Sequence, residues 1–280
     1  MAVRIVTDST SDLNSQIASE LGITVVPLYV HFGTQSYQNG VDLTTGEFYR
    51  KLASSKTLPT TAVPSPASFA QVYDRLAQET DEIVVISLAS KLSSVHEMES
   101  QAVGMMRRKC RIEVIDSKAG CMALGLITVA AAKAANAGAK TDDILSAIQR
   151  NINRSKICFA FDTLEFLKRG GRVNAAQAFL GSMLRVNPIM TLEEGEGRPL
   201  GRPRSRAKAI EFLYRFAMSF SNIEEMAIED ATTPEEADML AERLGARFPK
   251  ERIYRTKVSP VVGTHVGPHV LAVSVLGDRD

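Results

Sequence analysis

The sequence lacks the features that mark disulfide scaffolds, metal knuckles and membrane proteins. It has three cysteines in 280 residues and no C-x-x-C pair, so we expect neither a disulfide framework nor a zinc knuckle. The formal net charge is only +1, which gives no electrostatic basis for nucleic acid as the main partner. No apolar run reaches the roughly 18–20 residues that span a bilayer, and the chain starts as a strand rather than as a secretory leader. We therefore expect a cytoplasmic protein with no membrane span.

What the sequence does contain is a regular alternation of strands and helices in its first half. The runs 82–88 (EIVVISL) and 111–116 (RIEVID) are expected strands, because buried parallel strands carry apolar residues on both faces. Two more strands are expected at 3–7 and 23–32. Helices are expected at about 13–21 (capped by Ser11 or Asp12), 44–55 (with a Thr44–Glu47 capping box), 64–79, 93–109 and 121–138. This pattern predicts an α/β fold whose N-terminal domain, residues 1–155, is a parallel-sheet α/β/α domain.

The second half, residues 156–280, alternates less regularly and predicts a smaller α+β domain. Expected strands include 225–230, 251–257 and 269–276, with helices centred on 207–219 and 234–244. The glycine-containing stretch 193–201 (EEGEGRPLG) resembles a phosphate loop, but it lacks a following helix and a Walker lysine. A hairpin turn is therefore the preferred interpretation.

Polar side chains follow three of the expected parallel strands, at the point where each strand ends. Asp8, Ser9 and Thr10 follow the first strand, residues 87–90 follow another, and Asp116 begins a third cluster. In open α/β sheets the ligand crevice lies outside the carboxyl ends of the strands. The sequence therefore predicts a ligand site where these loops meet, with Asp8 accepting hydrogen bonds from the next turn.

Three chemistries could use such a site. A metal site would draw on Asp8, Asp12, Asp116 and the four histidines, but Gly267 and Pro268 argue against one helix carrying both His265 and His269. A serine hydrolase could pair His265 with Ser93 or Ser9, although no G-x-S-x-G elbow is present. We expect neither a metal nor a cofactor, and the hydrolase remains the alternative to a binding protein.

The third chemistry is a hydroxyl and histidine cradle beside an apolar tunnel. Hydroxyl groups can donate hydrogen bonds to a carboxylate without a fully buried ion pair. The apolar stretch 175–190 could supply the tunnel wall, or it could simply belong to the core. The candidate wall residues are Phe179, Leu180, Met183, Leu184 and Met190.

Seven segments, taken together and in order, resemble the DegV family of fatty-acid-binding proteins, which includes the acyl-binding subunits of bacterial fatty acid kinase. They span essentially the whole chain. The segments are IVTDSTSDL, PTTAVPSPASF, KLSSVHEMESQA, VIDSKAGCMALGL, DTLEFLKRGGRVN, FLGSMLRVNPIMTL and VVGTHVGPHVLAV.

This resemblance implies a long-chain fatty acid bound between two domains, with no catalysis by the chain itself. It implies that Thr61, Ser93, His265 and Arg172 bind the carboxylate, and that a separate kinase converts the bound acid to acyl phosphate. Ala62, Val63, Ser94 and His96 depart from the family pattern. These departures bear on acyl specificity more than on the fold.

A run of arginines follows the expected hairpin. Arg202, Arg204 and Arg206 are spaced so that a strand would place all three on one face. Like charges on one face repel each other, so we expect them either to dock an acidic partner, such as the kinase, or to form an ordinary solvated loop.

Overall fold

The computed structural model describes residues 2–172 and 186–279. The predicted parallel sheet is present, with strand order β2 (Thr24–Val26), β1 (Arg4–Asp8), β6 (Glu82–Ser87) and β7 (Arg111–Asp116). All its neighbouring strands are parallel. Helices pack against this sheet, as crossover connections require. The predicted α/β fold class is therefore confirmed.

A second, six-stranded sheet lies in the other half of the chain. Its order is β10 (Glu196–Gly201), β9 (Ile189–Glu193), β8 (Ser155–Ala160), β13 (Leu271–Asp278), β11 (Asn222–Asp230) and β12 (Ile253–Lys257). Only β11 and β12 pair in parallel. β9 and β10 form the hairpin predicted for the glycine-containing stretch, and it turns at Glu194 and Gly195. The proposed domain boundary at residue 155 falls where this sheet begins.

The run 23–32, expected to be one strand, is in fact two strands in different sheets. β2 ends before Pro27, and β3 (Tyr29–Phe32) pairs instead with β4 (Gln35–Gln38) and β5 (Thr60–Ala62) in an antiparallel sheet. Proline has no N–H to donate to a ladder, so a strand that includes it is readily interrupted. This small sheet was not predicted, and it carries Thr61.

The helices predicted within the described residues are present with shifted ends, whereas the helices at 141–154 and 260–266 were not predicted. The helices of this part of the chain are α1 (Ser15–Leu21), α2 (Thr45–Ser54), α3 (Pro66–Leu76), α4 (Val95–Val103), α5 (Cys121–Asn136), α6 (Thr141–Arg154), α7 (Glu165–Arg169), α8 (Arg206–Met218), α9 (Pro234–Leu244) and α10 (Pro260–Val266), with short 3-10 turns η1 (Ser9–Ser11) and η3 (Lys250–Arg252). The Thr44–Glu47 capping box is confirmed. The expected cap of α1 was wrong, because the Asn14 side chain accepts from the N–H of Ile17. α4 also ends earlier than expected, at Gly104.

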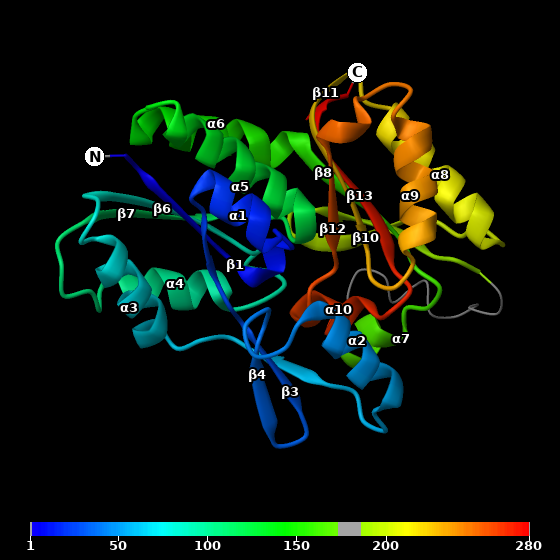
Figure 1. Cartoon of the computed structure of the whole chain (residues 1–280), viewed down its shortest axis with the longest axis horizontal. Coiled ribbons are helices and arrows are strands. Elements are labelled where there is room, and N and C mark those ends of the chain that lie inside the picture. Colours follow the sequence, from blue (N-terminus) through cyan, green and yellow to red (C-terminus); the bar gives the residue numbers. More distant parts are fainter. Residues whose placement is uncertain (1, 173–185, 280) are drawn as a thin grey trace.

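Helix α5 is the central element of the molecule (Figure 1). With α6 it packs between the four-stranded and the six-stranded sheets, while α8 and α9 cover the outer face of the larger sheet. Over residues 121–129 α5 is buried all round, including Met122, Leu124, Leu126 and Ile127, and its exposed side chains, Lys133 and Asn136, lie toward its C-terminal end. A helix that is apolar on every side belongs in a core. It joins both halves of the chain into one continuous apolar cluster. No helix in the described part of the chain has both the length and the hydropathy of a membrane span.

Candidate functional site

The loops at the carboxyl ends of the parallel strands are tied together through Asp8. Its Oδ1 accepts from the Thr10 N–H at 2.8 Å and from the Thr10 hydroxyl at 2.5 Å. Its Oδ2 accepts from the Leu88 N–H at 3.0 Å, which connects the loop after β1 to the loop after β6. Ser90 in turn donates to Asp116, after β7, from its N–H and its hydroxyl. The predicted convergence of these loops, and the predicted role of Asp8 as an acceptor, are confirmed.

A cavity of about 450 Å³ opens beside these loops. Its wall is assembled from segments far apart in sequence: Thr10 after β1, residues 61–63 at β5, the loop and helix start around Leu92 and Ser93, and Phe159 and Phe161 at the end of β8. Helices α7 and α10, and strands β9 and β10, also contribute side chains. The cavity therefore lies among all three sheets. Its volume falls within the range of about 300–1,000 Å³ typical of small-molecule sites.

All four predicted carboxylate-binding residues, Thr61, Ser93, Arg172 and His265, line this cavity. We call them the polar cluster. Thr61 Oγ1 and His265 Nε2 are 3.0 Å apart, although they are separated by 204 positions. Thr61 is held by the pairing of β5 with β3, and His265 by α10, which ends before Gly267 as the sequence suggested. His269 lies outside this helix, beside Thr232, so the two histidines do not form a pair.

His265 is neutral at physiological pH. Burial lowers the pKa of His265 to about 4, and the nearby positive charge of Arg172 acts in the same direction. Its Nδ1 is buried and has no hydrogen-bond partner among residues 2–172 and 186–279. An unpaired acceptor costs less than an unpaired N–H donor, so the tautomer that carries its proton on Nε2 is favoured. In that tautomer His265 donates to Thr61, and the Thr61 hydroxyl can donate its own proton onward.

Arg172 connects two parts of the cavity wall. Its Nη1 donates to the carbonyl of Gly170 at 2.6 Å, and its Nε donates to the carbonyl of Leu92 at 3.2 Å, next to Ser93. Gly170 is needed for this arrangement, because a Cβ there would lie 2.4 Å from His265 Nδ1. The Gly-Gly-Arg turn therefore brings a cation close to the histidine.

Most of the remaining cavity wall is apolar. Phe159 and Phe161 face the cavity side of β8, while Cys158 and Ala160 pack into a separate core beneath α8 and α9. This alternation is the strand period of two, and it could have identified both phenylalanines from the sequence. Met190 lines the cavity as predicted. Phe179, Leu180, Met183 and Leu184 lie outside the described residues.

The serine hydrolase arrangement is not assembled. Ser93 lines the cavity, but in the described residues no hydrogen bond joins it to His265, whose Nε2 contacts Thr61 instead. The other ring nitrogen has no carboxylate to orient it. A triad requires both contacts.

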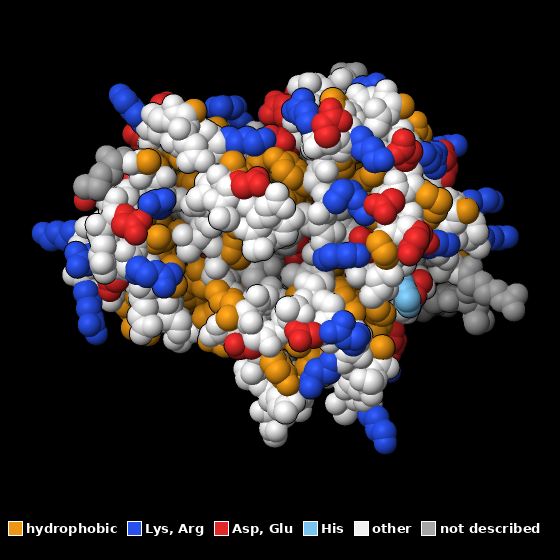
Figure 2. All heavy atoms as spheres, in the orientation of Figure 1, with side chains coloured by type: hydrophobic (Ala, Val, Ile, Leu, Met, Phe, Trp, Pro, Cys, Tyr) orange, Lys and Arg blue, Asp and Glu red, His pale blue; other side chains and the backbone are white. Residues whose placement is uncertain are grey.

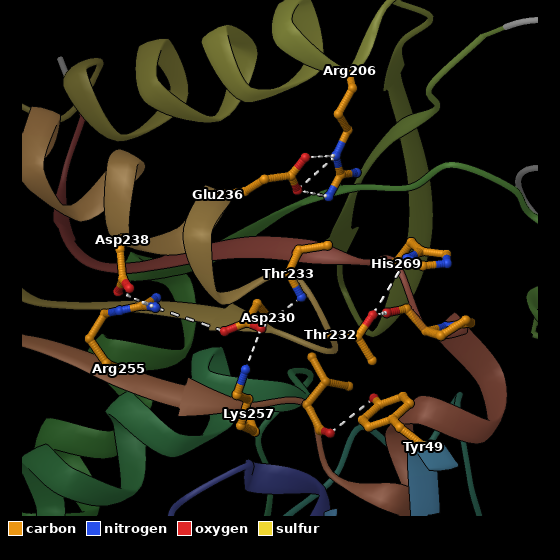
Figure 3. Close-up of polar contacts among 12 residues, drawn as sticks. Tyr49, Arg206, Asp230, Thr232, Thr233, Glu236, Asp238, Arg255, Lys257 and His269 are labelled. Atoms are coloured by element: carbon orange, nitrogen blue, oxygen red, sulfur yellow. Dashed lines mark hydrogen bonds and ion pairs between the residues drawn. The ribbon is translucent and has the colours of Figure 1, made fainter. Parts of the chain in front are cut away.

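The three arginines do not share a strand face, so that prediction was wrong. β10 ends at Gly201, and Arg206 is the first residue of α8. Its guanidinium forms a bidentate ion pair with Glu236 (Figure 3), and it also donates to the Ala160 carbonyl. Arg202 and Arg204 lie in the exposed connection between β10 and α8. On the face shown in Figure 2, basic and acidic side chains are interspersed over α8 and α9.

The fold and cavity define an α/β protein with an internal, mainly apolar cavity. A family model described as "Uncharacterised protein, DegV family" matches residues 2–278. A DegV domain-containing protein of Streptomyces coelicolor is 35% identical over 277 residues, which is 98% of each chain. The chain therefore belongs to the DegV family.

Solved structures agree with this assignment. The structure described as "Fatty Acid Binding of a DegV family Protein from Thermus thermophilus" is 30% identical and superimposes with a TM-score of 0.91, covering 99% of this chain and all of the other. The structure of DegV, a fatty acid binding protein from Bacillus subtilis, is 28% identical with a TM-score of 0.89 and the same coverage.

Proposed function

We propose that this protein binds one long-chain fatty acid, with its carboxylate on the polar cluster and its acyl chain along the apolar wall. The observation that carries the proposal is the Thr61–His265 contact in the wall of a mainly apolar cavity. The names of the Thermus thermophilus and Bacillus subtilis relatives support the same ligand class.

The polar cluster suits a carboxylate because it offers donors and one cation. The Thr61 hydroxyl, polarised by His265, donates to one carboxylate oxygen, and the Ser93 hydroxyl donates to the other. Arg172 supplies positive charge at the cavity wall, where its own contacts to Gly170 and Leu92 hold it. Hydrogen bonds to an ionised acceptor are roughly twice as strong as neutral ones. An ester or alcohol of the same length would lose this contribution.

The apolar wall suits the acyl chain. Leu28, Met98, Phe159, Phe161, Met190 and Leu192 line the cavity. Each buried methylene contributes about 0.8 kcal/mol, so chain burial supplies most of the affinity and the polar cluster supplies the selectivity for an acid.

The proposal includes presentation of the bound acid to a separate kinase that forms acyl phosphate, with no catalysis by this chain. Arg172 is exposed while still lining the cavity, so a partner could approach the carboxylate from that side. Docking through Arg202 and Arg204 belongs to the same proposal. Arg206 is already engaged by Glu236, so we assign it to holding α9 against α8.

The experiment is native mass spectrometry of the purified protein, together with analysis of its organic extract. We expect one fatty acid per chain, and we expect added acid to raise the Tm of delipidated protein. An empty extract combined with an unchanged Tm would refute the proposal. The hydrolase alternative predicts ester turnover that disappears in Ser93→Ala, and burst kinetics with a trapped acyl-serine would favour it.

A further inference from the structure

A second cluster of ligand-bearing side chains lies behind the cavity, where both halves of the chain meet. It consists of Asp12 at the end of η1, Cys121 at the start of α5, and Glu229 on β11. One carboxylate oxygen from each acid and the Cys121 Sγ lie within 4.8 Å of one another, and all three residues are buried. None of these residues belongs to the polar cluster.

The two carboxyl groups are only half satisfied. Asp12 Oδ1 accepts from the Ser259 N–H at 3.2 Å, and Glu229 Oε1 accepts from the Met122 N–H. Their other oxygens, Asp12 Oδ2 and Glu229 Oε2, are buried with no hydrogen-bond partner. Over residues 2–172 and 186–279, no Lys, Arg or His forms an ion pair with either acid, and no hydrogen bond links the Cys121 thiol to them.

Two other buried acids, Asp8 and Asp230, are compensated by donors or cations, whereas Glu99 accepts from the Ser87 hydroxyl through Oε2 and keeps Oε1 unpaired within the described residues. Both oxygens of Asp8 accept hydrogen bonds, and Asp230 pairs with Lys257 and Arg255 (Figure 3). Buried carboxyl groups normally have such partners, because an isolated one is costly. Unlike Glu99, Asp12 and Glu229 lie together and beside a thiol, and this grouping of three ligand-bearing side chains points to a missing cation.

We propose that Asp12, Cys121 and Glu229 bind a divalent cation of the zinc class. A thiolate with two carboxylates provides three ligands of the types that Zn²⁺ accepts, whereas Mg²⁺ and Ca²⁺ prefer oxygen alone. Binding releases the thiol proton, since the thiolate is the ligand. Cys121 also lines the cavity, which gives the ion a route in. This proposal departs from our expectation, made from the sequence, that the protein binds no metal.

The site would join the two halves of the chain. Asp12 follows the four-stranded sheet, Glu229 belongs to the six-stranded sheet, and Cys121 begins the helix between them. An ion held by all three would therefore stabilise the folded protein by linkage. It would act independently of the fatty acid, which the polar cluster binds elsewhere in the cavity wall.

The experiment titrates the purified full-length protein with Co²⁺ and Zn²⁺, with Mg²⁺ as a comparison. We expect one equivalent of Co²⁺ to produce a thiolate-to-cobalt charge-transfer band, and Zn²⁺ but not Mg²⁺ to raise the Tm. Cys121→Ser should abolish the band, and Glu229→Gln should weaken binding roughly tenfold or more. The matched control is Cys158→Ser, which alters a buried cysteine in a different core cluster and should keep the band.

Two results would overturn the proposal: no band with an unchanged Tm in the wild type, or a band that persists in Cys121→Ser. If Cys121→Ser does not fold, wild-type protein still gives an answer. Stoichiometric Zn²⁺ should slow the alkylation of Cys121, which peptide mass spectrometry measures over time. An unchanged alkylation rate would refute the site.

Discussion

Replacing Thr61 by valine removes one hydroxyl from the cavity with almost no change in side-chain shape. The lost oxygen lies 3.0 Å from His265 Nε2, so the variant loses this contact and the donor proposed for the ligand carboxylate. In the empty protein the net cost of one hydrogen bond is only about 0.5–1.5 kcal/mol. In the complex, a buried ionised acceptor is left short of a donor, which costs about 1–3 kcal/mol.

Through the relation between free energy and affinity, this cost corresponds to a dissociation constant for fatty acid that rises about 5- to 150-fold. Isothermal titration of delipidated protein with a fatty acid and with the fatty alcohol of the same length measures it. The preference for acid over alcohol should fall by a similar factor. Thr60→Val is the matched control, because Thr60 is the adjacent residue on β5, is exposed, and does not line the cavity.

Equal affinity of wild type and Thr61→Val for the acid would refute the head-group assignment. An equal loss for acid and alcohol would also refute it, because that outcome would mean the variant had disturbed the acyl-chain wall instead. Weakening by Thr60→Val as well would show that β5 as a whole had moved.

Four further predictions follow from other parts of the structure. Ser93→Ala should weaken acid binding by about 1–3 kcal/mol in the same titration, with unchanged alcohol binding. Burial raises the pKa of Glu99 well above its usual value, so the folded state keeps a proton that the unfolded state releases, and stability falls as pH rises above about 4.5. For one proton, the free energy of unfolding falls by at most about 1.4 kcal/mol per pH unit. Urea unfolding measured from pH 5 to 7 should show a smaller decrease in Glu99→Gln than in the wild type. Gly267→Ala should lower the free energy of unfolding in urea more than Gly138→Ala. Both glycines have φ near +84°, but of the two only Gly267 would place a Cβ against another side chain, 2.5 Å from Phe166. Equal losses in the two variants would contradict the steric argument. Arg204→Glu should leave Tm and acyl content unchanged but slow acyl phosphate formation by a cognate kinase, and the slowing should be larger at low salt. Unchanged kinetics at low and at high salt would remove Arg204 from the proposed docking surface.

Local signals in the sequence predicted the elements that depend on near neighbours. The capping box of Thr44 and Glu47, and the apolar strand 82–87, depend on residues within one turn or one strand. The split at Pro27 also had a local signal, the missing N–H of proline. Our prediction of one continuous strand over 23–32 did not take this proline into account.

The arginine run shows why a local period can mislead. Alternate spacing of Arg202, Arg204 and Arg206 fits a strand, but the chain leaves the sheet at Gly201 and Ser205 caps α8 by accepting from the Lys208 N–H. A serine before a helical stretch was the competing signal. Glu236, which neutralises the charge of Arg206, lies 30 positions away in the sequence. The spacing of the three arginines therefore could not indicate this ion pair.

Long-range pairing accounts for what the sequence could not indicate. Thr61 and His265 were assigned to one site only because the sequence resembles a family. They are 204 positions apart, so no local pattern relates them. Asp12, Cys121 and Glu229 had no such guide, since a thiol and two acids at unrelated spacings match no ligand motif. They meet only because α5 packs between two sheets, with its first residue directed at the loop after β1 and at β11. Both sites therefore depend on the same helix. α5 forms the core that joins the halves of the chain, and its first residue, Cys121, borders the cavity on one side and the half-satisfied carboxyl groups of Asp12 and Glu229 on the other.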